Sequence, residues 1–249
     1  MKPDDTPVDL FAQWEGAVAF RMFADQDEPT LTVSEQIAAR VGDRILDGKM
    51  PPGARVGEQE LADEFAVSRG PIRDALRILE REGLITLLPR RGAIVTELSA
   101  SELRELLEIR GGLFEIVVRK VAAQPDAPLL ELMRGGVARL QLLADAEGAG
   151  DEYAETTYRL LLLCARQCSN QRLRRMLTAL SLQTLRYSKL GLATVARRQQ
   201  SARLWQEATE ALARRDVERA VALMRQRIEE SGEEAIRMLE ASRTPGDAA

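Results

Sequence analysis

Residues Glu58–Thr96 read EQELADEFAVSRGPIRDALRILEREGLITLLPRRGAIVT, and this stretch decides the fold of the chain. Its first part predicts a helix, because apolar residues recur there at helical spacing: Leu61, Ala62 and Phe65. Ser68 stands where its hydroxyl can cap a second helix, and Pro71 falls in the first turn of that helix, where a missing N–H costs nothing. We therefore expect two helices joined by a short turn.

The second helix is expected to have two distinct sides. One side is apolar and can pack against a core: Ile72, Ala75, Leu76 and Leu79. Another side carries an arginine at every fourth position: Arg69, Arg73, Arg77 and Arg81. Gly83 is a suitable helix stop, and two short strands are expected after it, at Leu84–Leu88 and Ala93–Thr96. Helix, turn, helix and β-hairpin in this order indicate a winged helix-turn-helix.

The arginine stripe and the hairpin tip place cations where double-stranded DNA can meet them. The second helix of such a motif enters the major groove by its N-terminal residues, here Ser68, Arg69, Gly70 and Arg73. The tip residues Arg90, Arg91 and Gly92 suit a phosphate backbone or a minor groove. Arg77 and Arg81 lie further back and suit intramolecular pairs or phosphates at the edge of the site. Arginines at this spacing usually form a solvated face with carboxylate partners, but the preceding helix, short turn and basic hairpin together favour DNA binding.

Residues 46–96 resemble the DNA-binding domain of the GntR family of bacterial transcription regulators. The resemblance rests on five short motifs: Pro52–Gly53, Glu60–Ala62, Ser68–Leu76, Gly83–Leu84 and Arg91–Val95. It implies DNA contacts from these residues in particular: Ser68, Arg69, Arg73, Arg91 and Gly92. Family members commonly have a DNA-contacting arginine where this chain has Gln59, and a glutamine can still bond a phosphate or an adenine.

The composition fits a DNA-binding regulator and disfavours several other classes. The chain has 249 residues, of which 45% are hydrophobic, enough for two domains that each have a hydrophobic core. Its formal net charge is −4, which still allows a local basic patch. Aromatic residues make up 4%, which disfavours recognition of single strands by stacking. The longest apolar run, Leu160–Ala165, is far shorter than the roughly 20 residues of a membrane span, and the acidic start is unlike a signal peptide. We expect no membrane association and a cytoplasmic location.

The chain divides into four segments by its patterns. Residues 1–31 are expected to be a flexible extension, 32–98 the winged domain, 99–241 an all-helical domain, and 242–249 a flexible tail. Ser99 and Glu102 form a capping box that begins the helical domain. Helical periodicity then predicts an all-α antiparallel bundle of six or seven helices, with later members at Leu129–Ala146, Asp151–Cys168, Asn170–Leu190, Val195–Ala213 and Asp216–Leu239. The fold class is therefore mainly α with one small hairpin.

The helical domain resembles the effector-binding, dimerising C-terminal domain of the FadR subfamily of GntR regulators. The resemblance rests on the first helix around Arg110, on Ser169–Leu173 and on Glu210–Met224. It implies a homodimer, and it implies that Arg110 points into a ligand cavity.

The subfamily often binds a metal through one aspartate and three histidines, and this chain has no histidine. Counting from the flanking motifs, the four ligand positions fall on Thr157, Leu161, Trp205 and Arg227, so we expect no metal and no other cofactor.

The cavity formed by these residues in place of metal ligands is expected to suit an anion. Arg227 and Arg110 would favour a carboxylate, while Trp205, Leu161 and Thr157 offer apolar surface and one hydroxyl, which fits a small organic acid. The alternative, weighed equally, is that Arg227 pairs with a local glutamate such as Glu152 or Glu230 in a cavity without a ligand. For Cys164 and Cys168, core packing is the preferred interpretation over a redox or soft-metal role.

The sequence thus predicts a homodimeric regulator, more specifically a repressor, that binds a pseudo-palindromic operator and responds to an organic acid. An enzyme is disfavoured, because without histidine there is no imidazole base, and there is no P-loop or Rossmann glycine pattern. Two alternatives stay open: a ligand-independent architectural DNA-binding dimer, and a protein-interaction module.

Overall fold

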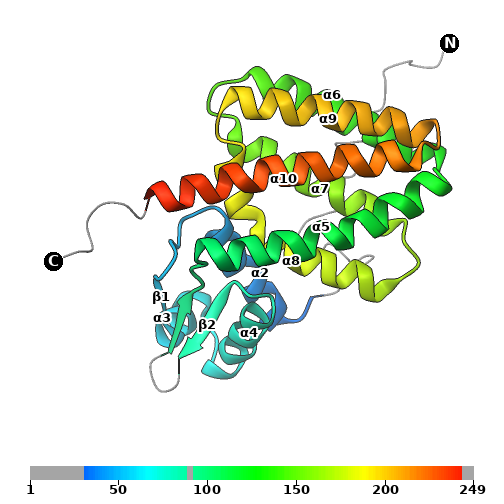
Figure 1. The fold of residues 1–249 in the computed structure, drawn as a ribbon. Coiled ribbons are helices and arrows are strands. Elements are labelled where there is room, and N and C mark those ends of the chain that lie inside the picture. Colours follow the sequence, from blue (N-terminus) through cyan, green and yellow to red (C-terminus); the bar gives the residue numbers. More distant parts are fainter. Residues whose placement is uncertain (1–30, 89–91, 243–249) are drawn as a thin grey trace, which may run out of the picture.

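The computed structural model describes residues 31–88 and 92–242, which form a small winged part beside a larger helical bundle (Figure 1). The winged part consists of α2 (Val33–Leu46), β1 (Arg55–Val56), α3 (Glu58–Phe65), α4 (Arg69–Arg81), β2 (Ile85–Leu88) and β3 (Gly92–Val95). Apart from Leu31, the expected N-terminal extension lies outside the described residues, as do Arg90, Arg91 and the stretch 243–249 of the expected tail.

Local sequence signals explain where the helices of the winged part begin and end. Thr32 and Glu35 form a reciprocal capping box at the start of α2. The predicted apolar side of α4 is confirmed, since Ile72, Ala75, Leu76 and Leu79 are all buried. Gly83 ends this helix with a φ of +72°, a conformation that glycine adopts without strain. Ser68 does occupy the N-cap position, but the expected hydroxyl cap is wrong: its side chain makes no capping hydrogen bond.

The small sheet has one strand more than the predicted hairpin. Its order is β1-β3-β2, with β3 antiparallel to both neighbours. Arg55 pairs with Ile94 and Val56 with Ala93, so β1 covers the outer edge of β3. A two-residue strand is too short to show any alternation of apolar and polar residues, which is why the sequence pattern missed it.

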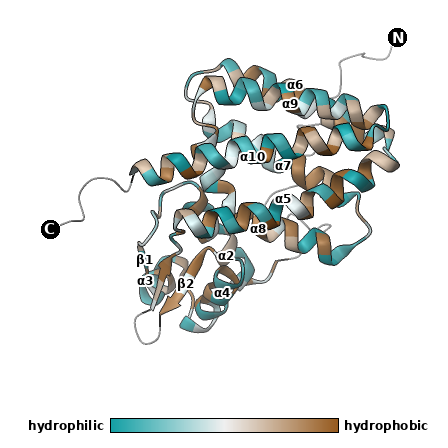
Figure 2. Cartoon of the chain, viewed as in Figure 1, coloured by the Kyte–Doolittle hydropathy of each residue, from teal (hydrophilic) through white to brown (hydrophobic). Residues whose placement is uncertain are grey.

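Six helices form the bundle within the described range, in agreement with the predicted six or seven: α5 (Ala100–Ala123), α6 (Ala127–Asp145), α7 (Gly150–Arg166), α8 (Gln171–Gly191), α9 (Val195–Ala213) and α10 (Val217–Ser242). The predicted capping box of Ser99 and Glu102 is confirmed at the start of α5. Figure 2 shows hydrophobic and hydrophilic residues interleaved along these helices, as amphipathic packing requires.

Both cysteines contribute to packing rather than to a crosslink. α7 ends at Arg166, so Cys168 lies beyond the helix that was expected to contain it. The two side chains are buried and carry free thiols, and the Cys164 Sγ lies 3.8 Å from the Met133 Sδ. Burial raises the pKa of the Cys164 thiol to about 12, which keeps this group protonated and unreactive at neutral pH.

The C-terminal half of α8 connects the bundle to the winged part. The Lys189 ammonium donates to the backbone carbonyl of Leu46 at 3.0 Å, where α2 ends. The backbone N–H of Leu98 donates to the Tyr187 hydroxyl at 2.9 Å, and the Arg186 guanidinium donates to the carbonyl of Thr96. One stretch of helix therefore holds the winged part at two places, the end of α2 and the segment that follows β3.

Across the part of the chain that the structure describes, no helix is both long enough and apolar enough to cross a bilayer.

Candidate nucleic-acid interface and effector cavity

The N-terminus of α4 is an open, positively polarised surface. Ser68, Arg69, Gly70 and Arg73 are all exposed, and the first turn of α4 contains no acidic residue. A Cβ atom built on Gly70 would approach nothing closer than the Ser68 Oγ, at 4.0 Å. The free N–H groups and the helix dipole at this end can therefore receive an anionic oxygen, assisted by two guanidinium groups.

Gln59 on α3 braces Arg69 from the neighbouring helix. The Arg69 Nε donates to the Gln59 Oε1 at 2.9 Å, and the Gln59 Nε2 donates to the Asp63 Oδ1 at 2.7 Å. The glutamine that departs from the family pattern is thus tied to the first arginine of the stripe. It can act through the orientation of Arg69 as well as by direct contact with DNA.

The remaining arginines of the stripe have carboxylate neighbours within the chain. The Arg73 Nε lies 3.1 Å from the Glu58 Oε2, and both side chains are substantially exposed. Such an exposed pair contributes about 0–1 kcal/mol, so a DNA phosphate can displace the carboxylate. Arg77 pairs with Asp74 at 3.6 Å and Arg81 with Glu82 at 3.4 Å, which confirms the intramolecular pairing considered for these two arginines.

The wing is anchored at Gly92, while its two predicted cations lie outside the described residues. Gly92 begins β3 opposite Leu88 with a φ of +85°, a backbone conformation that disfavours any side chain. Arg55, on β1 beside β3, adds an exposed guanidinium next to the wing. The sequence analysis missed this residue because its strand was not predicted.

The predicted effector residues come together in the centre of the bundle. Arg110, Thr157, Leu161 and Arg227 line one cavity of about 30 Å³, between α5, α7, α8 and α10. Trp205 is buried beside it, with its ring 4.7 Å from the Arg227 guanidinium carbon, close enough for a cation–π contact. The cavity is lined in addition by hydroxyls that were not predicted, including Ser181, Ser188 and Ser231.

Neither glutamate suggested as a partner of Arg227 contacts it. Glu152 pairs with Arg139 at 2.6 Å, and Glu230 pairs with Arg197 at 3.0 Å. Arg227 instead stacks on Trp205, and its buried Nε has no hydrogen-bond partner among the residues that the structure describes. The pairing alternative is therefore wrong for these two glutamates.

The electrostatic environment of the cavity favours an anion. Burial, and to a smaller extent the charge of Arg227, together lower the pKa of Arg110 to about 9. Burial likewise lowers the pKa of Arg227 to about 10. Both groups remain cationic at neutral pH, so two positive charges lie in a poorly solvated site. The hydroxyls of Ser181 and Ser231, which have no hydrogen-bond partner in the described part of the chain, lie beside them.

The donor set at the four positions that the resemblance assigns to metal ligands does not fit a metal ion. Thr157, Leu161, Trp205 and Arg227 offer a hydroxyl, an alkyl group, an indole and a cation, whereas zinc and nickel sites use imidazole, thiolate or carboxylate. Within the described residues no three cysteine, aspartate or glutamate side chains lie together as a candidate metal cluster. The Arg227 guanidinium would in addition repel a dication.

Arg110 links this cavity to α8. Its Nη1 donates to the Thr184 Oγ1 at 2.7 Å and lies 3.5 Å from the Ser188 Oγ. Thr184 and Ser188 flank Arg186 and Tyr187, which bind the segment that follows the wing. The cavity and the winged part therefore contact the same two turns of one helix.

Comparisons with known proteins agree with both parts of this architecture. The family model "Bacterial regulatory proteins, gntR family" matches residues 33–95, and that of the FCD domain matches residues 105–230, about half of the chain. An HTH-type transcriptional regulator of Bacillus subtilis, YdhC, is 38% identical over 89 residues, which are 36% of this chain and 40% of YdhC. The gluconate operon transcriptional repressor of Bacillus licheniformis is 41% identical over 75 residues, 30% of each chain.

The similarity to these two curated relatives spans less than half of their lengths. Among solved structures, E. coli McbR/YncC superposes with a TM-score of 0.67 at 19% identity, covering 86% of this chain and 99% of that one, which shows a shared fold. The gntR family model covers the winged part, and the FCD model covers most of the helical bundle. The gntR family consists of regulators rather than enzymes. The chain belongs to the gntR family of bacterial regulatory proteins, and its helical bundle is an FCD domain.

Proposed function

We propose that this protein is a homodimeric repressor in the cytoplasm, which binds a pseudo-palindromic operator through α4 and the wing. The observation that carries the proposal is the open N-terminus of α4, where Ser68, Arg69 and Arg73 are exposed without an acidic residue in the first turn. A two-fold dimer presents two such helices, which matches two half-sites about one helical turn apart. The acidic net charge is compatible with this, because DNA responds to the local field.

The test starts with selection of genomic fragments by the full-length protein, followed by fluorescence anisotropy on the selected operator. Replacing Arg69 and Arg73 together by alanine is expected to weaken operator binding by about 1–3 kcal/mol for each base-reading contact. Arg237→Ala is a matched control, since Arg237 is an exposed arginine of α10 paired with Glu234 at 2.6 Å. Equal affinities of the double variant and this control would reject α4 as the reading helix.

We further propose that the cavity between Arg110 and Arg227 binds the carboxylate of a small organic acid. Two buried cations without a carboxylate neighbour within residues 31–88 and 92–242 support this, as do the hydroxyls of Ser181 and Ser231, which are unpaired in the same range. A volume of about 30 Å³ holds little more than one water molecule, whereas ligand pockets commonly enclose about 300–1,000 Å³. The anionic group of a ligand can fit with little change, but its body requires the helices around the cavity to separate.

This requirement suggests how the ligand controls DNA binding. A carboxylate that binds Arg110 competes with Thr184 and Ser188 for the same guanidinium, and the body of the ligand displaces α8. Because α8 holds Leu46, Thr96 and Leu98 of the winged part, its displacement changes how the two winged parts are placed. The ligand shifts operator affinity to the extent that it binds one placement more tightly than the other.

Calorimetry of the full-length protein against mono- and dicarboxylic acids of two to eight carbons tests this proposal. Binding that disappears in both Arg110→Met and Arg227→Met supports it, and so does weaker operator binding at saturating ligand. The absence of any binder in the panel would favour the ligand-independent architectural dimer instead.

A further inference from the structure

A groove runs along the outside of the bundle between α5 and α10, which lie side by side (Figure 1). It encloses about 390 Å³, within the range of about 300–1,000 Å³ that is typical of ligand pockets. Its floor consists of apolar side chains that are buried or partly buried: Leu107, Phe114, Val221, Met224, Ile228 and Ile236. The effector cavity, at about 30 Å³, has room only for the head of a ligand, so the groove offers the space that the cavity lacks.

The side chain of Ile228 lies between this groove and the effector cavity, because it lines both of them. In each of three pairs of neighbouring residues the first lines the cavity and the second lines the groove: Arg110–Gly111, Arg227–Ile228 and Ser231–Gly232. Gly111 has no side chain, and a Cβ atom built on it would lie 3.8 Å from the Ile228 Cγ2. We call this contact of Gly111 with Ile228 the seam, and a ligand that extends from the cavity into the groove has to pass it.

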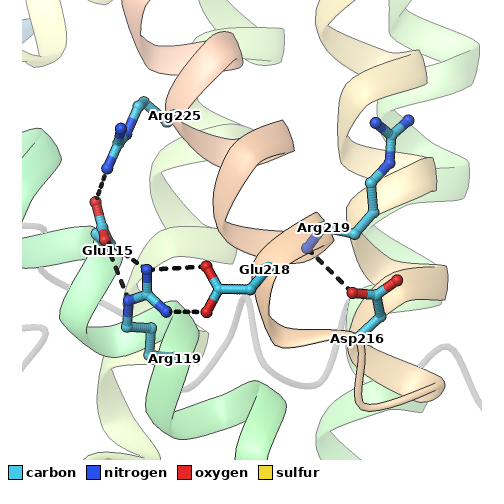
Figure 3. A network of polar contacts seen from close by, with 6 residues as sticks. All are labelled: Glu115, Arg119, Asp216, Glu218, Arg219 and Arg225. Carbon is cyan, nitrogen blue, oxygen red and sulfur yellow. Dashed lines mark hydrogen bonds and ion pairs between the residues drawn. The ribbon is translucent and has the colours of Figure 1, made fainter.

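The ion network in Figure 3 ties α5 to α10 on one side of the seam. Arg225 of α10 pairs with Glu115 of α5 at 2.5 Å, and Arg119 of α5 bridges Glu115 and Glu218 of α10 at 3.0 and 2.6 Å. Glu115 and Arg225 both line the groove, about one helical turn from the seam. A ligand chain that passes the seam is therefore expected to run the other way along the groove, toward Arg104.

This part of the groove suits an apolar chain that carries no second negative charge. From Gly111 back to Arg104 α5 rises about 10 Å, which is roughly the extended length of eight carbon atoms joined by bonds of about 1.5 Å. Four carboxylates and two guanidinium groups line the groove and give it a net charge of −2: those of Glu108, Glu115, Glu229 and Glu233, and those of Arg104 and Arg225. A carboxylate at the far end of a ligand would therefore be repelled.

We propose that the effector is a monocarboxylic acid with an apolar chain, whose carboxylate binds between Arg110 and Arg227 and whose chain passes Ile228 into the α5–α10 groove. The inference rests on the carboxylate site proposed above and names the class of acid that it takes. The carbons next to the carboxylate stay in the cavity against α8, and the rest of the chain lies on the apolar floor of the groove. The Ile228 side chain turns aside to let the chain pass.

Calorimetry of the full-length protein tests this with two series of straight-chain acids, monocarboxylic and dicarboxylic, each of four to eight carbons. The affinity for the monocarboxylic acids is expected to rise with every added methylene, by about 4-fold where the groove buries it fully and about 2-fold where it buries half of it. The dicarboxylic acids should gain nothing from added length, because their second carboxylate would enter the negatively charged groove.

A substitution inside the groove shows where the chain binds. Gly111→Leu places a side chain beside the seam, and its Cβ makes only an ordinary contact with Ile228, so the dependence of affinity on chain length should disappear. Gly135→Leu is the matched control, since Gly135 is an exposed glycine of α6, and this variant should keep the dependence. Circular dichroism verifies that both variants fold. Ile228→Ala gives a second measurement: it removes most of the partition and should raise the affinity for octanoic acid relative to butanoic acid.

The outcomes separate this inference from the proposal on which it rests. Monocarboxylic acids that bind with an affinity independent of chain length would overturn the groove while leaving the carboxylate site standing. The groove would be overturned in the same way by dicarboxylic acids that gain as much from added length, by a length dependence that Gly111→Leu leaves unchanged, or by one that Ile228→Ala reduces. If no acid of either series binds, the carboxylate site itself fails, and the groove fails with it.

Discussion

Arg227→Met is expected to make the ligand-free protein more stable while abolishing carboxylate binding. The pKa of Arg227 is lowered by burial to about 10 from the usual 12.5, so the folded chain disfavours the charged form by roughly 3 kcal/mol. The contact with Trp205 returns about 1–2 kcal/mol of this. Methionine fills a similar volume without a charge, so the variant should gain about 1–2 kcal/mol.

The pH dependence of the destabilisation by Arg227 determines the pH at which unfolding should be measured. Because the pKa is lowered, the cost of the buried cation is present in full below about pH 10 and is relieved only as the pH rises above that value. Urea and thermal unfolding at pH 7 therefore report the whole effect. For a domain of this size the gain corresponds to a rise in melting temperature of roughly 2–8 °C.

Arg198→Met is the matched control, because Arg198 is equally buried but fully bonded. It is 1% exposed and donates to four backbone carbonyls: those of Leu143, Ala146, Leu192 and Ala193, at 2.6 to 3.3 Å. These charge-assisted bonds close the ends of α6 and α8, so their loss should cost at least about 3 kcal/mol. If Arg227→Met destabilises the protein as Arg198→Met does, Arg227 is a structural residue and the anion site is refuted.

Three further substitutions probe the interface, the ion network and the helix end. Gln59→Ala should weaken operator binding about 5-fold, because Arg69 loses the hydrogen bond that orients it. Fluorescence anisotropy measures this, and an unchanged affinity would show that Gln59 does not position Arg69. Glu115→Gln should lower stability at pH 7, and this loss should shrink as the pH falls below 4.5. Arginine hydrogen bonds, first from Arg225 and then from Arg119, lower the pKa of this carboxyl, so its contribution is present above the usual value of 4.5 and is lost as the pH falls through the folded-state value. Unfolding curves across pH 3–7 check this, and parallel curves for variant and wild type would contradict it. Gly83→Ala should destabilise the chain by about 1–2 kcal/mol, since the residue has a positive φ and an added Cβ would come within 2.6 Å of Gln183; a melting temperature equal to that of the wild type would show that this turn relaxes freely.

The stability cost at Arg227 has a functional meaning within the proposed function. Two buried cations without a carboxylate partner among the described residues destabilise each other, and an anion bound between them would offset this cost. At one of the four positions that the family resemblance assigns to metal ligands, this chain has the fixed positive charge of Arg227, which would attract a carboxylate without a metal.

Much of this molecule follows from local sequence, because the forces involved act within a few residues. Helical spacing of apolar residues located α4 and every later helix, the Ser99–Glu102 box located the start of α5, and Gly83 located the end of α4. The motif spacing also identified four cavity residues that are up to 117 positions apart in sequence, although only by resemblance to a family.

Tertiary structure alone decided which polar groups are paired, because burial and partner choice depend on segments far apart in the chain. Nothing local distinguishes Arg198, which is saturated by four carbonyls, from Arg227, which stacks on Trp205 and has no carboxylate partner among the described residues. The strand β1 likewise exists only because β3 offers it an edge. The shared role of α8 arises because packing brings Arg110 to one side of it and the winged part to the other.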